Sequence, residues 1–450
     1  MASKTLGYAL MLDASPSVGN DISMIIIDGK AFIRESRDGD QFAVNRFSDY
    51  AEWVYPTGSN PNIATVHGRT EIDAAEPRID KIYPFGSWTN ITDAIKLANT
   101  MIDKSSANIK ALILITDGEH NKGKPFPEDV LRSNIPLYVG GWGYRLNENY
   151  LKQLAEKTNG GKFYYKPDAY DMQGIFNQIL ADSKKSTLAL NGKNTYVKSS
   201  GDFFTQSFNL SDKDSRANLS VVWSDKRYSY TPNSPKNFEI NLVLRDPDGQ
   251  KKSVEPFINN NGSCIFHLDN VKPGKWQLLT QYAVGEGIRG TTGVIDFNST
   301  ISSKIVTSNM VSQGEQIDLK LSVFSENNPI ENASVQAQVS VPLLSIDDAL
   351  NRYEKDFKNI EVDKSSENES VELAKLKAFR KAKLQSNGID IMERKETMAN
   401  LPMSNDGLYA CQIAQTQTKG IYSMEIAING INPKTGIPFT RLEHHSVFVE

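Results

Sequence analysis

Three side chains with hard oxygen atoms follow directly on an apolar run near the amino terminus. The run from Tyr8 to Leu12 ends at Asp13, and Ser15 and Ser17 follow at alternate positions. Such a run is typical of a buried strand, so the carboxylate and the two hydroxyls would gather just past its carboxyl end. Carboxylate and hydroxyl oxygens suit Mg²⁺, Mn²⁺ or Ca²⁺, and not Zn²⁺ or copper. The spacing therefore predicts a divalent-cation site.

Two later segments supply further oxygen ligands in a similar setting. Thr89 lies in a loop that opens a helical pattern, and Asp117 ends the apolar run that starts at Lys110. In an open parallel sheet, ligands bind beyond the carboxyl ends of the strands. We therefore expect Asp13, Ser15, Ser17, Thr89 and Asp117 to meet at one edge of a sheet. The alternative is that these residues only cap helices, as Ser and Asp commonly do.

The elements that would position these residues alternate between strand and helix from Leu6 to about Lys185. Apolar residues at helical spacing occupy 91–102 and 172–180. The alternation predicts a doubly wound α/β domain over 1–185, with a mostly parallel sheet and helices on both faces. Its expected strands are 8–12, 42–47, 52–55, 111–115, 137–140 and 162–165.

The remainder of the chain has a different pattern, with short alternating strands broken by Asn, Pro, Gly and Asp. It predicts two all-β, immunoglobulin-like sandwiches, over 190–300 and 302–450. Residues 345–395 interrupt the second with apolar residues at helical spacing, which predicts an inserted helical hairpin. Its buried face would carry Leu373, Leu376 and Phe379, and we expect its basic residues to be solvated: Lys377, Arg380 and Lys381.

Composition limits the classes of function that the chain can have. Its 450 residues are 39% hydrophobic and 23% charged, with a net charge of −4. These values suit a soluble protein of several domains, without a general attraction to nucleic acid and without a membrane span. The first strand begins almost at the amino terminus, which predicts a cytoplasmic protein, or a secreted one if a signal segment was removed. The two cysteines, Cys264 and Cys411, fall in different predicted domains and are expected to be free thiols.

The sequon at Asn90 adds to the interpretation of the compartment. Asn90-Ile-Thr92 is a glycosylation acceptor that lies within the predicted cation loop. A glycan there would crowd the cation, so we expect that the chain does not mature in a glycosylating pathway. A bacterial or cytoplasmic origin is favoured.

The three loops together resemble the metal-ion-dependent adhesion site of the von Willebrand factor A family. The resemblance covers roughly the first 185 residues and implies one Mg²⁺, or Mn²⁺ or Ca²⁺, at the top of the sheet. It implies that Ser15, Ser17 and Thr89 are direct ligands, and that Asp13 and Asp117 hold the ion directly or through water. It further implies a protein partner that offers an acidic side chain to the metal.

The whole chain resembles the calcium-activated chloride channel regulators. The similar segments are "LVLRDPDGQ" (242–250), "KPGKWQL" (272–278), "NPIENASVQAQV" (328–339) and "NDGLYACQI…GIYSMEIAI" (405–428). Members of that family carry a zinc protease domain, but no His-Glu-x-x-His occurs in this sequence. The family's self-cleavage is therefore not expected here.

We interpret the chain as a non-enzymatic binding protein, either an adhesin or an adaptor. The alternatives are an adaptor of an AAA+ ATPase machine and a metal-dependent hydrolase. His120 is three residues from Asp117 and is expected to be a solvated loop histidine. His444 and His445 are neighbours on a predicted strand, so their side chains should point to opposite faces and not share a metal.

Overall fold

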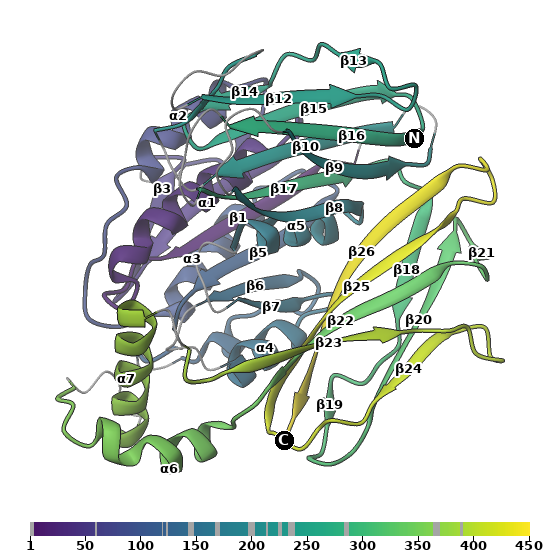
Figure 1. The fold of residues 1–450 in the computed structure, drawn as a ribbon. Coiled ribbons are helices and arrows are strands. Elements are labelled where there is room, and N and C mark those ends of the chain that lie inside the picture. The colour runs from purple at the N-terminus through teal and green to yellow at the C-terminus, as the bar shows by residue number, and fades with distance from the viewer. Residues whose placement is uncertain are drawn as a thin grey trace.

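The computed structural model describes residues 4–58, 61–118, 120–122, 125–142, 148–166, 172–196, 203–212, 215–223, 227–232, 239–282, 288–362, 370–387 and 390–450. In these residues the chain forms an α/β domain, two pairs of stacked sheets and an inserted pair of helices. Figure 1 shows the α/β domain (purple to blue) below the first sandwich (teal), with the second sandwich (green to yellow) beside both.

The α/β domain contains a mixed sheet in the order β3-β2-β1-β5-β6-β7, with β4 paired to β2. Its strands are β1 (Leu6–Asp13), β2 (Gln41–Phe47), β3 (Ala51–Tyr55), β4 (Ala64–Thr65), β5 (Ile109–Thr116), β6 (Leu137–Trp142) and β7 (Lys162–Lys166). The central strands β2, β1, β5, β6 and β7 are parallel, and β3 and β4 are antiparallel to β2. β1 is buried along its whole length, as expected of a strand covered on both faces.

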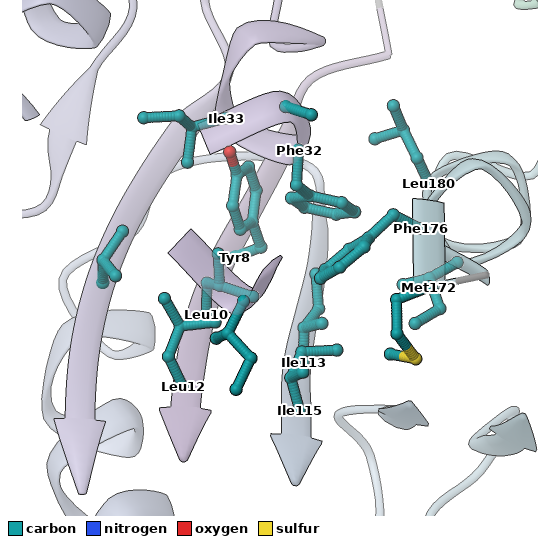
Figure 2. Close-up of a cluster of buried hydrophobic side chains, with 14 of the residues drawn as sticks. Tyr8, Leu10, Leu12, Phe32, Ile33, Ile113, Ile115, Met172, Phe176 and Leu180 are labelled. Carbon is teal, nitrogen blue, oxygen red and sulfur yellow. The ribbon is translucent and has the colours of Figure 1, made fainter. Parts of the chain in front are cut away.

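Helices cover both faces of this sheet. They are α1 (Ile22–Arg34), α2 (Thr70–Ile79), α3 (Ile91–Ile102), α4 (Glu148–Glu156) and α5 (Met172–Ser183), with two 3-10 turns, η1 (Gly19–Asp21) and η2 (Pro127–Asp129). On one face, side chains of β1 and β5 pack against α1 and α5, and Figure 2 shows Tyr8, Phe32 and Phe176 in this cluster. On the other face, α3 and α4 cover the sheet. The sheet is therefore held rigidly between two helical layers.

Three residues separate the end of α5 from the start of the first sandwich. Its strands are β8 (Thr187–Tyr196), β9 (Phe203–Leu210), β10 (Ser215–Trp223), β11 (Ser229–Tyr230), β12 (Glu239–Arg245), β13 (Lys251–Lys252), β14 (Ile258–Asn260), β15 (Ser263–Val271), β16 (Gly274–Tyr282) and β17 (Ile288–Asp296). They form one sheet in the order β14-β15-β10-β17-β8 and a second in the order β11-β12-β16-β9, with β13 on β12. Trp223, Trp276 and Leu278 are buried between the two sheets.

The second sandwich follows directly. Its strands are β18 (Ile301–Ile305), β19 (Met310–Val311), β20 (Ile317–Ser325), β21 (Asn328–Pro329), β22 (Ser334–Pro342), β23 (Arg394–Asn400), β24 (Tyr409–Ile413), β25 (Gly420–Ile431) and β26 (Pro438–Val449). β20 alternates between buried and more exposed residues, so only one of its faces packs on the core. β26 meets β8 at Leu442 and Leu188, so one continuous sheet runs through both sandwiches.

Two helices interrupt the second sandwich between β22 and β23. α6 (Ile346–Phe357) starts with a capping box between Ser345 and Asp348, and α7 (Val371–Asn387) packs on it. Leu376 and Phe379 of α7 are buried, and Leu373 is half-buried.

The expected solvation of Arg380 in α7 is wrong. Its guanidinium donates to Asp390 at 2.5 and 2.6 Å and to the hydroxyl of Tyr165 on β7 at 3.3 Å. Lys377 is half-buried, and the side chain of Lys381 lies outside the described set. The ion pair and the hydrogen bond tie the inserted hairpin to the α/β domain.

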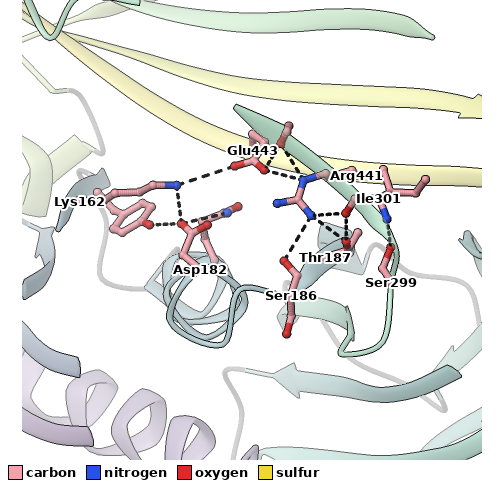
Figure 3. A network of polar contacts seen from close by, with 11 residues as sticks. Lys162, Asp182, Ser186, Thr187, Ser299, Ile301, Arg441 and Glu443 are labelled. Carbon is pink, nitrogen blue, oxygen red and sulfur yellow. Dashed lines mark hydrogen bonds and ion pairs between the residues drawn. The ribbon is translucent and has the colours of Figure 1, made fainter. Parts of the chain in front are cut away.

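Polar contacts fasten the three domains together. Arg37, just past α1, donates to Asn218 at 2.8 Å and to Asp269 at 2.7 Å, both in the first sandwich. Figure 3 shows a second junction, where Glu443 of β26 lies near Lys162 of β7 and accepts from Arg441. Glu443 also lines a cavity of about 750 Å³, which separates β7 and α5 from β22, β23 and β25. No helix among the described residues is long and apolar enough to cross a membrane.

Candidate metal centre

Asp13 is the last residue of β1 and its carboxylate is held on both oxygens. Oδ1 accepts from the backbone N–H of Ser15 at 2.8 Å, and Oδ2 accepts from the Thr116 hydroxyl at 2.5 Å. Asp13 is fully buried. Its orientation is therefore fixed by its own loop and by the end of the neighbouring strand β5.

A chain of hydrogen bonds continues from this loop to the end of β5. The hydroxyls of Ser15 and Ser17 share a hydrogen bond of 2.9 Å, and Ser17 Oγ donates to Asp117 Oδ1 at 2.8 Å. Ser15 and Asp117 are buried and Ser17 is half-buried. The structure thus brings together Asp13, Ser15, Ser17 and Asp117, from two loops that are 100 residues apart.

Thr89 approaches the same place from the loop before α3. Its backbone N–H donates to Asn121 Oδ1 at 2.7 Å, and the residue is 3% exposed. A Cβ added to Gly118 would lie 3.6 Å from Thr89 Oγ1 and 4.0 Å from Ser17 Oγ. Both hydroxyls therefore face the space beside Gly118, and the glycine leaves that space open.

Residues after β2 hold the Thr89 loop in position. The Ser48 hydroxyl lies 2.5 Å from the carbonyl oxygen of Phe85 and 2.8 Å from that of Trp88. Asp49 Oδ1 accepts from the backbone N–H of Ser87 at 2.8 Å and of Trp88 at 2.7 Å. Sequence reasoning missed Ser48, Asp49 and Asn121. The available signal was position, because Ser48 and Asp49 follow a parallel strand that ends at the same edge as β1.

Asn90, the residue of the sequon, caps α3. Its Oδ1 accepts from the backbone N–H of Asp93 at 3.1 Å, and its Nδ2 donates to the carbonyl of Asp49 at 3.1 Å. The residue is 8% exposed. A glycan on Nδ2 would therefore require this loop to open.

The electrostatics of the site are those of a carboxylate away from water. Burial raises the pKa of Asp13, and hydrogen bonds from Ser15 and Thr116 oppose the rise only in part. Burial disfavours the charged form of a carboxyl, whereas a nearby positive charge favours it. A cation at this edge would therefore stabilise Asp13 in its ionised form.

The donor set fits a hard divalent cation. It offers two carboxylates and three hydroxyls, and hard cations such as Mg²⁺ and Ca²⁺ take oxygen ligands. No group of three or more His, Cys, Asp or Glu side chains that could hold a metal occurs within the described residues. The ring of His120 lies 6.2 Å from that of Phe126, and this histidine is half-buried.

His444 and His445 lie far from this edge, on β26. His444 lies opposite Glu425 in the register of β26 and β25, and its ring lies 5.1 Å from that of Tyr164. His445 is the next residue of the same strand. Successive strand residues point to opposite faces, so these two histidines do not converge on one ion.

The α/β domain matches a known family. Residues 9–178 match the von Willebrand factor type A domain, so this part of the chain is a domain of that type. Inter-alpha-trypsin inhibitor heavy chain H3 of Rattus norvegicus is 30% identical over 110 residues, which is 21% of this chain. The matched stretch spans 12% of that protein's length, and the Mus musculus protein is 29% identical with the same coverage.

Similarity to solved structures is remote. A von Willebrand factor type A protein from Catenulispora acidiphila is 15% identical with a TM-score of 0.38, covering 73% of this chain and 65% of that one. The pilus adhesin SpaC from Lactobacillus rhamnosus GG is 10% identical with a TM-score of 0.35, covering 98% of this chain and 57% of its own. The whole-chain resemblance to calcium-activated chloride channel regulators stays a prediction.

Proposed function

We propose that this chain binds a protein partner through a divalent cation held at the edge of its A-type domain. The observation that supports the proposal best is the hydrogen-bonded chain from Asp13 through Ser15 and Ser17 to Asp117, with the Thr89 hydroxyl facing the same space. Five oxygen-bearing side chains from three loops converge there. The match of residues 9–178 to the von Willebrand factor type A domain supports a protein partner.

Each residue has a distinct part in the proposed site. Ser15, Ser17 and Thr89 would contribute neutral oxygen ligands, and Asp13 and Asp117 would supply the negative charge directly or through water. Mg²⁺ is the proposed ion, with Mn²⁺ or Ca²⁺ as substitutes. When bound, the cation offers a position that a carboxylate oxygen of the partner can take in place of water.

The same geometry favours binding over catalysis. Metal-assisted hydrolysis needs a general base within hydrogen-bond reach of the attacking water. Asp13 and Asp117, the two carboxylates of the proposed site, would be engaged with the ion directly or through water, which leaves neither as that base. We therefore propose a non-enzymatic adhesin or adaptor.

Titration calorimetry of the full chain with MgCl₂ and with MnCl₂ tests the ion. Asp13→Asn keeps the size of the side chain but removes its charge, and it should abolish the binding heat. Asp248→Ala is a matched control, because Asp248 is a carboxylate on a hairpin of the first sandwich. Equal binding by the wild type and the Asp13→Asn variant would refute the site.

A further inference from the structure

Exposed aromatic rings concentrate around the candidate metal centre. Among the described residues, four aromatic side chains are largely exposed, namely Tyr50 (53%), Tyr83 (59%), Phe126 (38%) and Phe204 (43%). Tyr50 follows β2, Tyr83 lies in the loop that leads to Thr89, and Phe126 lies in the loop after Asp117. Only Phe204, on β9, lies away from this edge. Three of the four therefore flank the loops that carry the oxygen ligands.

Two of these rings belong to one ordered group. The ring of Tyr50 lies 5.2 Å from that of Phe85. The guanidinium of Arg46 lies 4.6 Å from the centre of the Tyr83 ring and 4.8 Å from that of Phe85. Arg46 Nε in turn donates to Glu52 at 2.6 Å. We call Arg46, Tyr50, Tyr83 and Phe85 the aromatic platform.

The platform is fixed to the loops of the metal centre by backbone contacts. The N–H of Phe85 donates at 2.9 Å to the carbonyl of Ala14, which stands between Asp13 and Ser15. The Ser48 hydroxyl lies within hydrogen-bond distance of the carbonyls of both Phe85 and Trp88, next to Thr89. Platform and oxygen ligands thus share one loop framework, and a single segment could contact both.

The chemistry of the platform defines what it would bind. Rings held in place lose little conformational entropy on binding, and Tyr and Arg are enriched among residues that dominate binding energy. The charge of Arg46 is countered by Glu52, so the platform would not attract a second carboxylate. Its exposed ring surfaces suit an apolar or aromatic side chain, which stacks on rings in offset or edge-on geometry.

We propose that the partner segment carries two determinants: an acidic residue for the cation and, nearby in the same segment, an aromatic residue for the platform. The inference rests on the proposed function and adds the recognition chemistry of the partner. The acidic residue would supply dependence on the cation, and the aromatic residue would supply selectivity among acidic segments.

Selection from a random peptide library displayed on phage tests the proposal. The full chain is immobilised in MgCl₂, and bound phage are eluted with EDTA. The expected peptides contain Asp or Glu together with Phe, Tyr or Trp. Peptides that carry acidic residues without aromatic enrichment would overturn the platform and leave the cation proposal standing. Failure to recover any EDTA-eluted peptide would overturn both.

A selected peptide is then measured by calorimetry against variants of the full chain. The double variant Tyr50→Ala/Tyr83→Ala should bind it at least tenfold more weakly, while its affinity for Mg²⁺ stays unchanged. Phe204→Ala is the matched control, since it removes an exposed ring at a distance from the edge, and it should bind as the wild type does. Asp13→Asn should lose both ion and peptide. Equal peptide affinity in the double variant and the wild type would contradict the platform.

Discussion

Two buried carboxylate clusters in this molecule are built in opposite ways. At the junction of the three domains, Glu443 accepts from Arg441 at 2.7 Å and lies 3.8 Å from Lys162, which itself pairs with Asp182 at 3.1 Å (Figure 3). At the edge of the A-type domain, Asp13 accepts from backbone N–H groups and hydroxyls, among them the N–H of Ser15 and the hydroxyl of Thr116. One cluster contains its own cations, and the hydrogen-bond partners of Asp13 in the other are neutral.

The directions of the pKa shifts reflect this difference. Burial acts to raise both pKa values, but Arg441, Lys162 and Ser303 bring the pKa of Glu443 below its usual value. The pKa of Asp13 stays raised, because its hydrogen bonds do not outweigh burial. A buried carboxylate without a protein cation costs free energy when it is ionised, and a bound divalent cation would remove that cost. At the junction, the folded protein itself supplies the cations that balance the buried carboxylates. At the edge, the hydrogen-bond partners of Asp13 are neutral, so the carboxylate suits a cation bound from solution.

Breaking the junction should have the largest effect, and that effect should be on stability. Glu443→Gln leaves the charge of Arg441 without its carboxylate and removes one of the two carboxylates near Lys162. Removing one partner of a buried pair costs about 3–5 kcal/mol. We expect the midpoint of urea denaturation to fall accordingly, with Mg²⁺ affinity per folded molecule unchanged. A variant as stable as the wild type would contradict the role of the junction.

Removing the charge of Asp13 at the edge should weaken Mg²⁺ binding strongly and change stability little. We expect Asp13→Asn to weaken Mg²⁺ binding at least a hundredfold, or about 2.7 kcal/mol. In the absence of metal it should change stability less than Glu443→Gln does, because no protein cation is left unpaired. Calorimetry measures the Mg²⁺ affinity of both variants, and urea denaturation measures their stability. A stability loss in Asp13→Asn equal to that of Glu443→Gln would contradict the difference between the two clusters.

The sequence predicted which strand ends would meet at the edge, but not what holds them there. Asp13 and Asp117 each end an apolar run, and parallel strands end at the same edge, so their proximity follows from the pattern. Ser48, Asp49 and Asn121 act through hydrogen bonds between loops, whose paths no periodicity encodes. Arg380 was misjudged for a related reason, because Asp390 and Tyr165 come from outside its helix. The join of β8 to β26 likewise depends on tertiary packing.

Filling the space beside Gly118 should have an intermediate effect on the edge alone. A Cβ there makes only ordinary contacts with Thr89 and Ser17, so Gly118→Ala should fold normally. The methyl group would occupy space that a cation and its water need. We expect about tenfold weaker Mg²⁺ binding, or about 1.4 kcal/mol, in calorimetry. A control, Gly249→Ala, alters a turn of the first sandwich and should leave the affinity unchanged.

The smallest effect is on the pH dependence of stability, and it arises from His267 at the contact between the A-type domain and the first sandwich. Burial and the charge of Arg37 lower the pKa of His267 to about 3, and its ring stacks on Phe257 at 4.0 Å. The unfolded chain therefore binds a proton near pH 6.5 that the folded chain does not, so this residue makes stability fall as the pH drops from 6.5 toward 3. At pH 6 this residue lowers the free energy of unfolding by about 0.8 kcal/mol relative to high pH.

Thermal denaturation between pH 8 and 5 checks this effect. His267→Gln should show a flatter dependence on pH than the wild type. His67→Gln, which changes an exposed histidine, should follow the wild type. Parallel curves for all three proteins would show that His267 does not titrate as described.

An anomalous difference map from crystals soaked in MnCl₂ would locate the bound ion. We expect one peak within about 2.0–2.6 Å of the hydroxyl oxygens of Ser15, Ser17 and Thr89, with Asp13 and Asp117 beside it. We expect no peak at the junction of Lys162, Asp182 and Glu443. A strong peak elsewhere with none at the edge of the A-type domain, or a fully soaked crystal without any peak, would contradict a cation site formed by these five residues.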